Sequence, residues 1–277
     1  MANAEEAVNL TDMPENQQDD DIVVNYTDHF TAWCELDFGD GFLSPGGREE
    51  VAKIFQGIDL TGMEVLDIGV GLAGPACLMV EEHGAKRVTG IDVENPVLKR
   101  ATKTVNSRGL KDRVILKLVE PGPLPLPDGA FDFVFSKDAI IHVQDTQALF
   151  LEIFRVLKPG GWLAISDWYC TDEPFTDEMS TWVGRPNHGF SMEPIESDRN
   201  RFVAAGLVDV QILDRNSWFN NFCKSAAQKM RGSHYTKYVE ILGENSAQDG
   251  IRSWDELETI TSQGQLRPGH IRGRKPT

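Results

Sequence analysis

A short apolar run that ends beside a carboxylate and two glycines has the composition of a ligand-binding turn. Residues 64–68 read EVLDI, and Gly69 and Gly71 follow them before a helical pattern begins. This order predicts a buried strand, a tight turn and a helix N-terminus, where backbone N–H groups are free to bind a ligand. Glycine is needed where a ligand approaches the backbone, because a Cβ would stand in its way. We therefore expect a nucleotide-like ligand here.

The charge of Asp67 bears on which nucleotide binds. Residues 69–74 also fit the G-x-G-x-x-G pattern, and Asp92 lies about twenty residues further on, as a dinucleotide-binding fold requires. A nicotinamide-dependent oxidoreductase is therefore one interpretation. The Asp67 carboxylate, however, would repel an anionic pyrophosphate and attract a cation. S-adenosylmethionine (SAM), which carries an ammonium and a sulfonium, is favoured.

The composition predicts a cytoplasmic protein with one large domain. The 277 residues are 40% hydrophobic, which is enough to bury a full core. No apolar run reaches membrane-spanning length, and the N-terminus lacks the order of a signal peptide. The cysteines are scattered without metal-ligand spacing, which predicts a reduced protein and no metal site. They are Cys34, Cys77, Cys170 and Cys223.

The net charge of −16 argues against a nucleic-acid substrate, because a phosphate backbone needs a basic surface. Part of this charge lies in residues 1–22, which hold seven carboxylates and no Lys or Arg and are expected to form a disordered tail. We expect a small-molecule partner, no membrane contact, and a monomer or weak dimer.

Beyond the tail, strand and helix patterns alternate, which predicts an α/β fold with a mostly parallel sheet and helices on both faces. Helices are expected near 26–36, 48–56, 73–83, 95–108 and 145–157. Seven strands are expected at 64–68, 87–92, 113–118, 131–136, 161–167, 207–213 and 270–274, the last at an edge. Residues 23–277 would then form one domain. Helical insertions at about 173–205 and 215–263 are expected to form a lid over the carboxyl ends of the strands, where ligands bind in such folds.

Longer motifs indicate which family the chain resembles. Residues 26–28 read YTD, residues 38–47 read FGDGFLSPGG, residues 135–142 read FSKDAIIH and residues 157–161 read LKPGG. From Asn25 to about Lys158 the chain resembles the phosphoethanolamine N-methyltransferases, which are class I SAM-dependent methyltransferases. Sarcosine and dimethylglycine N-methyltransferases share the third motif but resemble the second less. The resemblance implies a Rossmann-like fold that binds SAM and releases S-adenosylhomocysteine.

The resemblance also implies which residues contact the cofactor. Ser44 would hold the carboxylate end of the methionine portion, which Asp67 and Gly69 would line, with Gly71 in the same turn. Lys137 stands where the family has Arg, so it keeps the charge but loses the planar fork.

The nucleoside end of the cofactor has its own implied contacts. Asp92 would accept hydrogen bonds from the ribose hydroxyls, and Val93 would pack on the adenine. Glu120 stands where the family has an Asp that accepts from the adenine amino group.

Tyr26 and His142 match the catalytic pair of the family. An amine with a pKa near 10 is deprotonated at pH 7 at a cost of roughly 4 kcal/mol, and a His near neutrality can take its proton. The Tyr26 hydroxyl could orient the imidazole and close the pocket. Asp138 could attract the cationic head of the substrate.

The substrate side departs from the family. Trp168 and Trp182 stand where the family has phosphate-binding tyrosines, and Arg185 matches an arginine one position out of register. Tryptophan offers no hydroxyl, and each lost charged hydrogen bond costs roughly 1.5–3 kcal/mol. Trp168, Trp182, Tyr169 and Phe190 could instead line an amine pocket or pack in the core.

The expected function is N-methylation of a small polar amine, either phosphoethanolamine-like or glycine- or sarcosine-like. Alternatives are a SAM-dependent methyltransferase acting on carbon, oxygen or sulfur, the nicotinamide-dependent oxidoreductase, and a protein that senses SAM without catalysis.

Overall fold

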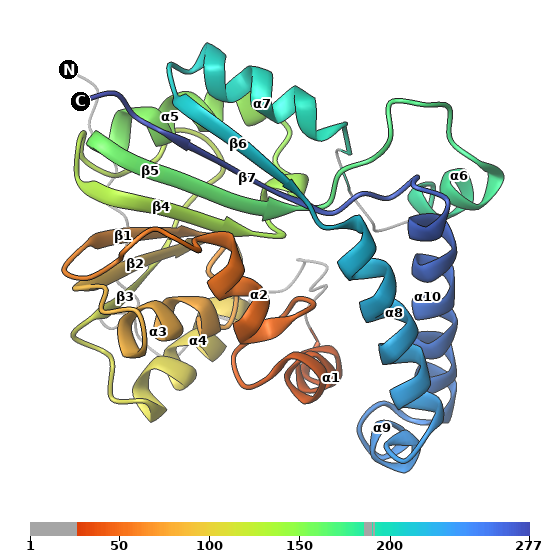
Figure 1. The fold of residues 1–277 in the computed structure, drawn as a ribbon. Helices are drawn as coiled ribbons and strands as arrows, with labels where there is room; N and C mark the ends of the chain where they lie inside the picture. Colours follow the sequence, from red (N-terminus) through yellow and green to blue (C-terminus); the bar gives the residue numbers. More distant parts are fainter. Residues whose placement is uncertain (1–26, 186–189, 191) are drawn as a thin grey trace.

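The structure, a computed structural model, describes residues 27–185, 190 and 192–277. The expected acidic tail and the predicted catalytic Tyr26 lie outside these residues. A seven-stranded sheet in the order β3-β2-β1-β4-β5-β7-β6 forms the centre of the molecule (Figure 1). Its strands are β1 Glu64–Ile68, β2 Arg87–Asp92, β3 Val114–Leu118, β4 Phe131–Lys137, β5 Leu157–Asp167, β6 Val208–Asp214 and β7 Gly269–Arg274.

Most of the sheet is parallel, as the alternation of strands and helices predicted. Strands β1 to β5 pair in parallel, whereas β7 runs antiparallel to both of its neighbours. The prediction that the last strand lies at an edge is wrong, because β7 lies between β5 and β6. Gly269, His270 and Ile271 are buried, as expected in an inner strand, whereas most residues of the edge strand β6 are exposed.

Helices cover both faces of the sheet, as predicted. Consecutive strand residues point to opposite faces, so that Val65 packs in one hydrophobic core and Leu66 in the other. Helices α2, α3 and α4 contribute to the core with Val65, and α5 and α7 to the core with Leu66 (Figure 1). Their bounds are α2 Gly47–Ile54, α3 Gly74–Glu81, α4 Asn95–Ser107, α5 Thr146–Val156 and α7 Ile195–Ala204.

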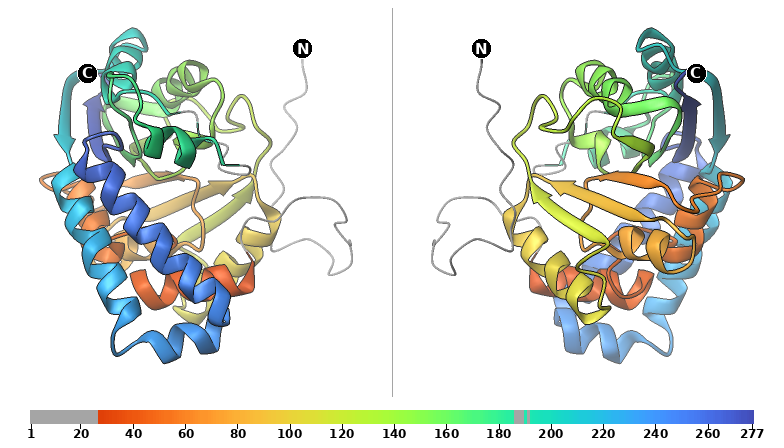
Figure 2. Two further views of the ribbon diagram at one scale, coloured as in Figure 1. Left: turned by 90° about the vertical axis from the view of Figure 1, so that its right-hand side faces the viewer. Right: turned by 90° about the vertical axis from the view of Figure 1, so that its left-hand side faces the viewer.

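The remaining helices form a layer beside the sheet with a third hydrophobic core. Helices α8 and α10 pack side by side, and α9 joins their far ends (Figures 1 and 2). Helix α7 falls within the first expected lid insertion, but it packs against α5, β6 and β7. The bounds are α1 Asp28–Phe38, α6 Asp177–Val183, α8 Asn216–Arg231, α9 Tyr235–Leu242 and α10 Glu244–Ser262.

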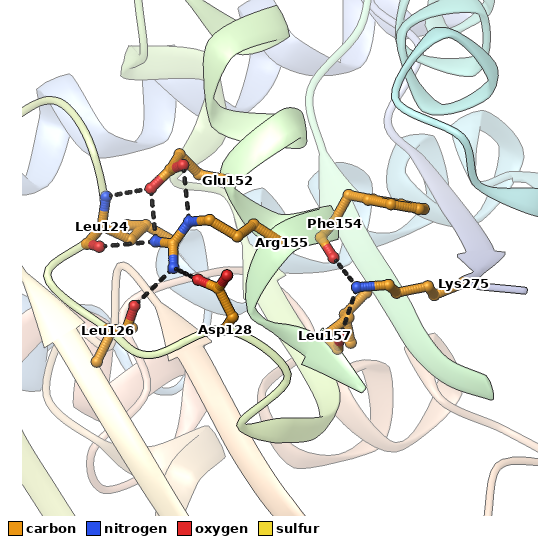
Figure 3. A network of polar contacts seen from close by, with 8 residues as sticks. All are labelled: Leu124, Leu126, Asp128, Glu152, Phe154, Arg155, Leu157 and Lys275. Carbon is orange, nitrogen blue, oxygen red and sulfur yellow. Dashed lines mark hydrogen bonds and ion pairs between the residues drawn. The ribbon is translucent and has the colours of Figure 1, made fainter. Parts of the chain in front are cut away.

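A polar network fixes α5 to the loop before β4 and to the end of the chain (Figure 3). The Arg155 guanidinium donates to two carboxylates and two backbone carbonyls, those of Glu152, Asp128, Leu124 and Leu126. The Lys275 ammonium donates to the carbonyl oxygens of Phe154 and Leu157. A cation at a helix C-terminus satisfies carbonyls that have no partner within the helix. The network therefore holds α5 against the loop before β4 and against the C-terminal residues.

Candidate active site

The glycine turn after β1 is tightly enclosed by other parts of the chain. Gly69 and Gly71 have φ angles of 71° and 55°, a region that favours glycine. A Cβ on Gly69 would overlap the Cβ of Ala139, and one on Gly71 would lie 3.1 Å from Leu43. The two glycines therefore allow the loops before α2 and after β4 to approach the turn. The sequence did not reveal this reason for glycine at these positions.

Asp67 is a buried carboxylate in β1, with a residue exposure of 1%. Its Oδ2 has no hydrogen-bond partner among the described residues. Burial raises the pKa of Asp67 to about 8, and the charge of Asp92 contributes further. A buried carboxylate oxygen without a partner is unfavourable, so a cation or a donor placed beside Asp67 Oδ2 would stabilise the ionised form of Asp67. This fits the cationic cofactor that the sequence suggests.

The residues predicted for the nucleoside follow the neighbouring strands. Asp92 ends β2, where its Oδ2 accepts from Gly71 N at 3.0 Å and its Oδ1 from Glu94 N at 3.0 Å. Val93 is 51% exposed, and Glu120, just after β3, is also exposed. The carboxyl ends of β1, β2 and β3 lie at one edge of the sheet, so the fold places Asp92, Val93 and Glu120 at the same edge as Asp67. The exposed apolar side chain of Val93 suits packing against a flat ring such as adenine.

Lys137 and Ser44 come from motifs far apart in the sequence, and the structure brings them together. The Lys137 ammonium donates to Ser44 Oγ at 2.8 Å and to Asp138 Oδ2 at 2.6 Å. The Lys137 side chain is 6% exposed, so the contact lies inside the protein. Asp138 was expected to attract a cationic substrate, but here its carboxylate is neutralised by its neighbour in the chain. Its φ of 53° bends the chain after β4.

His142 lies at the end of a 3-10 turn, η2 Ile140–His142, that follows β4. Its imidazole is partly open to solvent, and its ring centroid lies 5.5 Å from that of Phe190. Surrounding protein atoms lower the pKa of His142, and the charge of Asp138 only partly opposes this. A neutral imidazole at neutral pH can accept a proton, which is the role predicted for it.

Three aromatic rings lie together next to His142, at the border of the third hydrophobic core, and Trp182 is itself 4% exposed. The Trp168 and Trp182 rings are stacked with their centroids 5.9 Å apart, and Phe190 contacts both of them. Tyr169 is buried elsewhere, where its hydroxyl donates to Asp198. Arg185, predicted to bind substrate, donates to Glu256 of α10 at 2.7 Å. Its charge is therefore already neutralised within the protein.

The sequence did not single out Asp167, the last residue of β5. Asp167 is 3% exposed, and burial raises its pKa well above the usual range. Its position in the sequence could have identified it, because Asp167 is a carboxylate at the carboxyl end of a strand, as Asp92 is. Within the described residues, no group of three or more His, Cys, Asp or Glu side chains is placed to hold a metal ion.

A buried ionic cluster beside the site was also missed. Arg215, before α8, donates through two nitrogens to the Glu50 carboxylate of α2, both at 2.7 Å. His270 Nε2 lies 2.8 Å from Glu50 Oε1. Burial opposes ionisation of Glu50, but the contacts of its carboxylate with His270 and Arg215 outweigh burial and lower the pKa of Glu50 to about 2. The cluster connects α2, which follows the Ser44 loop, to the layer of α8 and α10.

Comparisons with known proteins agree with this geometry. Residues 66–165 match the family described as "Methyltransferase domain". The chain is 28% identical over 233 residues to phosphoethanolamine N-methyltransferase 1 of Zea mays, which covers 84% of this chain and 45% of that protein. It is 29% identical over 257 residues to phosphoethanolamine N-methyltransferase of Plasmodium falciparum, which covers 90% of this chain and 93% of that protein. The chain thus spans about half the length of the first relative and most of the second.

A solved structure gives the same result for the fold. Haemonchus contortus phosphoethanolamine N-methyltransferase 2, in complex with S-adenosyl-L-methionine, matches with a TM-score of 0.84 and 26% identity over 92% of this chain and 59% of that one. Across the described residues, no helix is both long and apolar enough to cross a membrane. The chain therefore has the class I methyltransferase fold, matches the methyltransferase-domain family over residues 66–165, and is similar to the phosphoethanolamine N-methyltransferases over most of its length.

Proposed function

We propose that this chain binds SAM at the carboxyl ends of β1, β2 and β4 and methylates the nitrogen of a small polar amine. The observation that carries the proposal is the buried Asp67 carboxylate, whose Oδ2 has no partner in the described structure. SAM supplies a methyl group on a cationic sulfur, and its ammonium is a donor. The names of the relatives, which are N-methyltransferases of phosphoethanolamine, support the same reaction class.

Each predicted cofactor residue has a role in this proposal. Asp67 and Gly69 line the methionine portion, and Lys137 with Ser44 holds its carboxylate. The Lys137 ammonium already donates to Ser44 Oγ, so a carboxylate placed between these two groups would replace that contact.

The nucleoside has a separate set of contacts. Asp92 accepts from the ribose hydroxyls, Val93 packs on the adenine, and Glu120 accepts from its amino group. Gly71 N already donates to Asp92, which fixes the carboxylate at the turn.

Catalysis in this proposal is mainly positioning and proton removal. The amine nitrogen forms a bond to the methyl carbon as the carbon–sulfur bond breaks, and the proton of the amine passes to His142. Tyr26 would orient the imidazole. Holding the two reactants in line can contribute an effective molarity of ~10⁵ M or more.

The acceptor pocket in this proposal is an aromatic wall formed by Trp168, Trp182 and Phe190. Ring faces attract ammonium groups and also pack against apolar groups. The wall therefore suits a methylated amine, and it is also the one observation that favours a less polar acceptor methylated on carbon, oxygen or sulfur. Arg185 would bind an anionic substrate group only if its pair with Glu256 opened.

We propose further that residues 23–277 act as one domain, with α6 and the layer of α8, α9 and α10 forming a lid over the site. The four cysteines are unpaired, which supports a cytoplasmic location. The cofactor sites lie within one chain, so a monomer or weak dimer would suffice.

Two experiments test this function. Calorimetric titration with SAM and with NADH separates a methyltransferase from an oxidoreductase, and only SAM is expected to bind. Methyl-labelled SAM is then incubated with phosphoethanolamine, ethanolamine, glycine and sarcosine, and label is expected on the nitrogen of at least one amine. Binding of SAM without transfer to any amine would contradict the proposed N-methylation.

A further inference from the structure

Asp167 occupies a position where two segments of the candidate active site meet. It ends β5, and both of its carboxylate oxygens accept from backbone N–H groups of these segments. Asp167 Oδ2 accepts from Ile141 N at 2.9 Å, and Oδ1 accepts from Trp168 N at 2.8 Å. Ile141 precedes His142 in the 3-10 turn, whereas Trp168 begins the aromatic wall.

The turn that carries His142 is also held by the buried side chains of Ile140 and Ile141 and by the bond from Asp138 N to Ser166 O, but none of these contacts satisfies Ile141 N. It is three residues long, and its N-cap, Ala139, makes no side-chain hydrogen bond. The first N–H groups of a helical turn lack partners within the turn, so an outside acceptor must satisfy them. For Ile141 N that acceptor is Asp167, which is itself 3% exposed and held at the end of an inner strand.

A carboxylate suits this position because it offers two acceptors. The side chain of Asn has one oxygen, so its amide group would face one of the two N–H donors, Ile141 or Trp168, without forming a bond. A buried donor left without a partner destabilises the local structure. The same carboxylate therefore links the position of the imidazole to that of the indole.

We propose that Asp167 is a positioning residue, which holds His142 and Trp168 in the relative geometry that the acceptor amine requires. This inference rests on the proposed function. Asp167 touches neither the glycine turn nor Lys137 in the described contacts, so it acts on the acceptor side and not on the cofactor. Burial raises the pKa of Asp167, while its two backbone hydrogen bonds favour the ionised form.

The test uses Asp167→Asn in the full chain, with Asp198→Asn as the matched control. Asp198 is also a buried carboxylate and lies near Asp167, but its oxygens accept from Tyr169 and Arg201 and not from Ile141 or Trp168. Three quantities are measured: SAM affinity by calorimetry, kcat and KM with the amine that shows the highest turnover, and amide exchange of Ile141 and Trp168 by NMR.

For Asp167→Asn we expect SAM affinity within about two-fold of wild type and a fall in kcat of about 100-fold, since a misplacement near 1 Å has that effect. At least one of the two amides should exchange about ten-fold faster, as expected for one lost hydrogen bond. Asp198→Asn should leave kcat and both amides unchanged.

Three results would overturn the proposal: wild-type kcat in Asp167→Asn, unchanged exchange of both amides, or loss of SAM binding with the fall in kcat. The last would show a general structural role. If the wild-type chain methylates no amine, the proposed function fails, and amide exchange still decides whether Asp167 holds the two segments.

Discussion

At the scale of single residues, the site is a set of charges whose partners decide their roles. Asp67 has an acceptor oxygen without a partner, whereas Asp138 is neutralised by Lys137 and Arg185 by Glu256. The sequence predicted four of these residues as site residues, from local motifs or from resemblance: Asp67, Lys137, Asp138 and Arg185. Their pairing could not be predicted, because it depends on which loops the glycine turn allows to approach.

His142→Ala is expected to lower kcat by about 10²- to 10⁴-fold, because it removes the group that we propose accepts the proton of the amine. SAM affinity should persist, since His142 is not among the predicted cofactor contacts. Because the pKa of His142 is lowered, its imidazole stays neutral to a more acidic pH than usual, and the acid limb of kcat/KM should lie below pH 6.5. Initial rates across pH measure both effects.

The control for this variant is His234→Ala, which removes an exposed imidazole between α8 and α9. It should retain wild-type kcat. Wild-type turnover in His142→Ala would remove the catalytic role assigned to that residue.

At the scale of elements, hydrophobic periodicity predicted the bounds of individual strands, because local sequence patterns determine them. The strands at 64–68 and 87–92 begin and end at the predicted residues, because apolar runs and turn residues mark them. The position of β7 was missed, since the order of strands in a sheet depends on contacts between distant segments. The pair of Glu50 and Arg215 was missed for the same reason, because 165 residues separate the two.

Arg215→Met tests the connection between α2 and α8. Removing one partner leaves the Glu50 charge buried, which is expected to lower the free energy of unfolding by about 3–5 kcal/mol at pH 7. The Glu50 pKa is lowered from 4.5 to about 2, so its stabilisation is complete above about pH 4.5 and is lost as the pH falls toward 2. The difference between the variant and the wild type should therefore shrink in acid.

Urea unfolding at pH 7 and at pH 3.5 measures this difference. Arg252→Met, which removes an exposed ion pair with Asp249, is the control and should change stability by about 0.5 kcal/mol or less. An equally small effect of Arg215→Met at pH 7 would show that the buried cluster does not hold the helical layer to the sheet.

At the scale of the whole molecule, the sheet positions the residues of the proposed cofactor site, and the layer of α8 and α10 lies beside the sheet. Composition and the alternation of strands and helices predicted the α/β class, and the resemblance suggested the proposed reaction. Neither indicated that α7 covers the sheet instead of belonging to that layer. The third core, which includes Trp182 and Trp254, gives this layer its own packing.

If the layer is a lid, binding of SAM together with an amine should slow backbone amide exchange in α6 and at the start of α8. Closing the lid would exclude water from the site, as in other enzymes that close over a substrate. Hydrogen exchange followed by mass spectrometry measures this, and exchange in α5 serves as the internal reference. Equal exchange in free and bound protein would contradict a lid.

The most direct test of the account is SAM affinity as a function of pH in the wild type and in Asp67→Asn. With the Asp67 pKa near 8 in the free protein, a cationic ligand favours the ionised carboxylate, so wild-type affinity should rise from pH 6 to pH 8 and then level off. Asp67→Asn should bind SAM more weakly, by about ten-fold or more at pH 8, with little dependence on pH. Equal affinity and an equal pH profile in the two proteins would contradict the claim that this carboxylate receives the methyl donor.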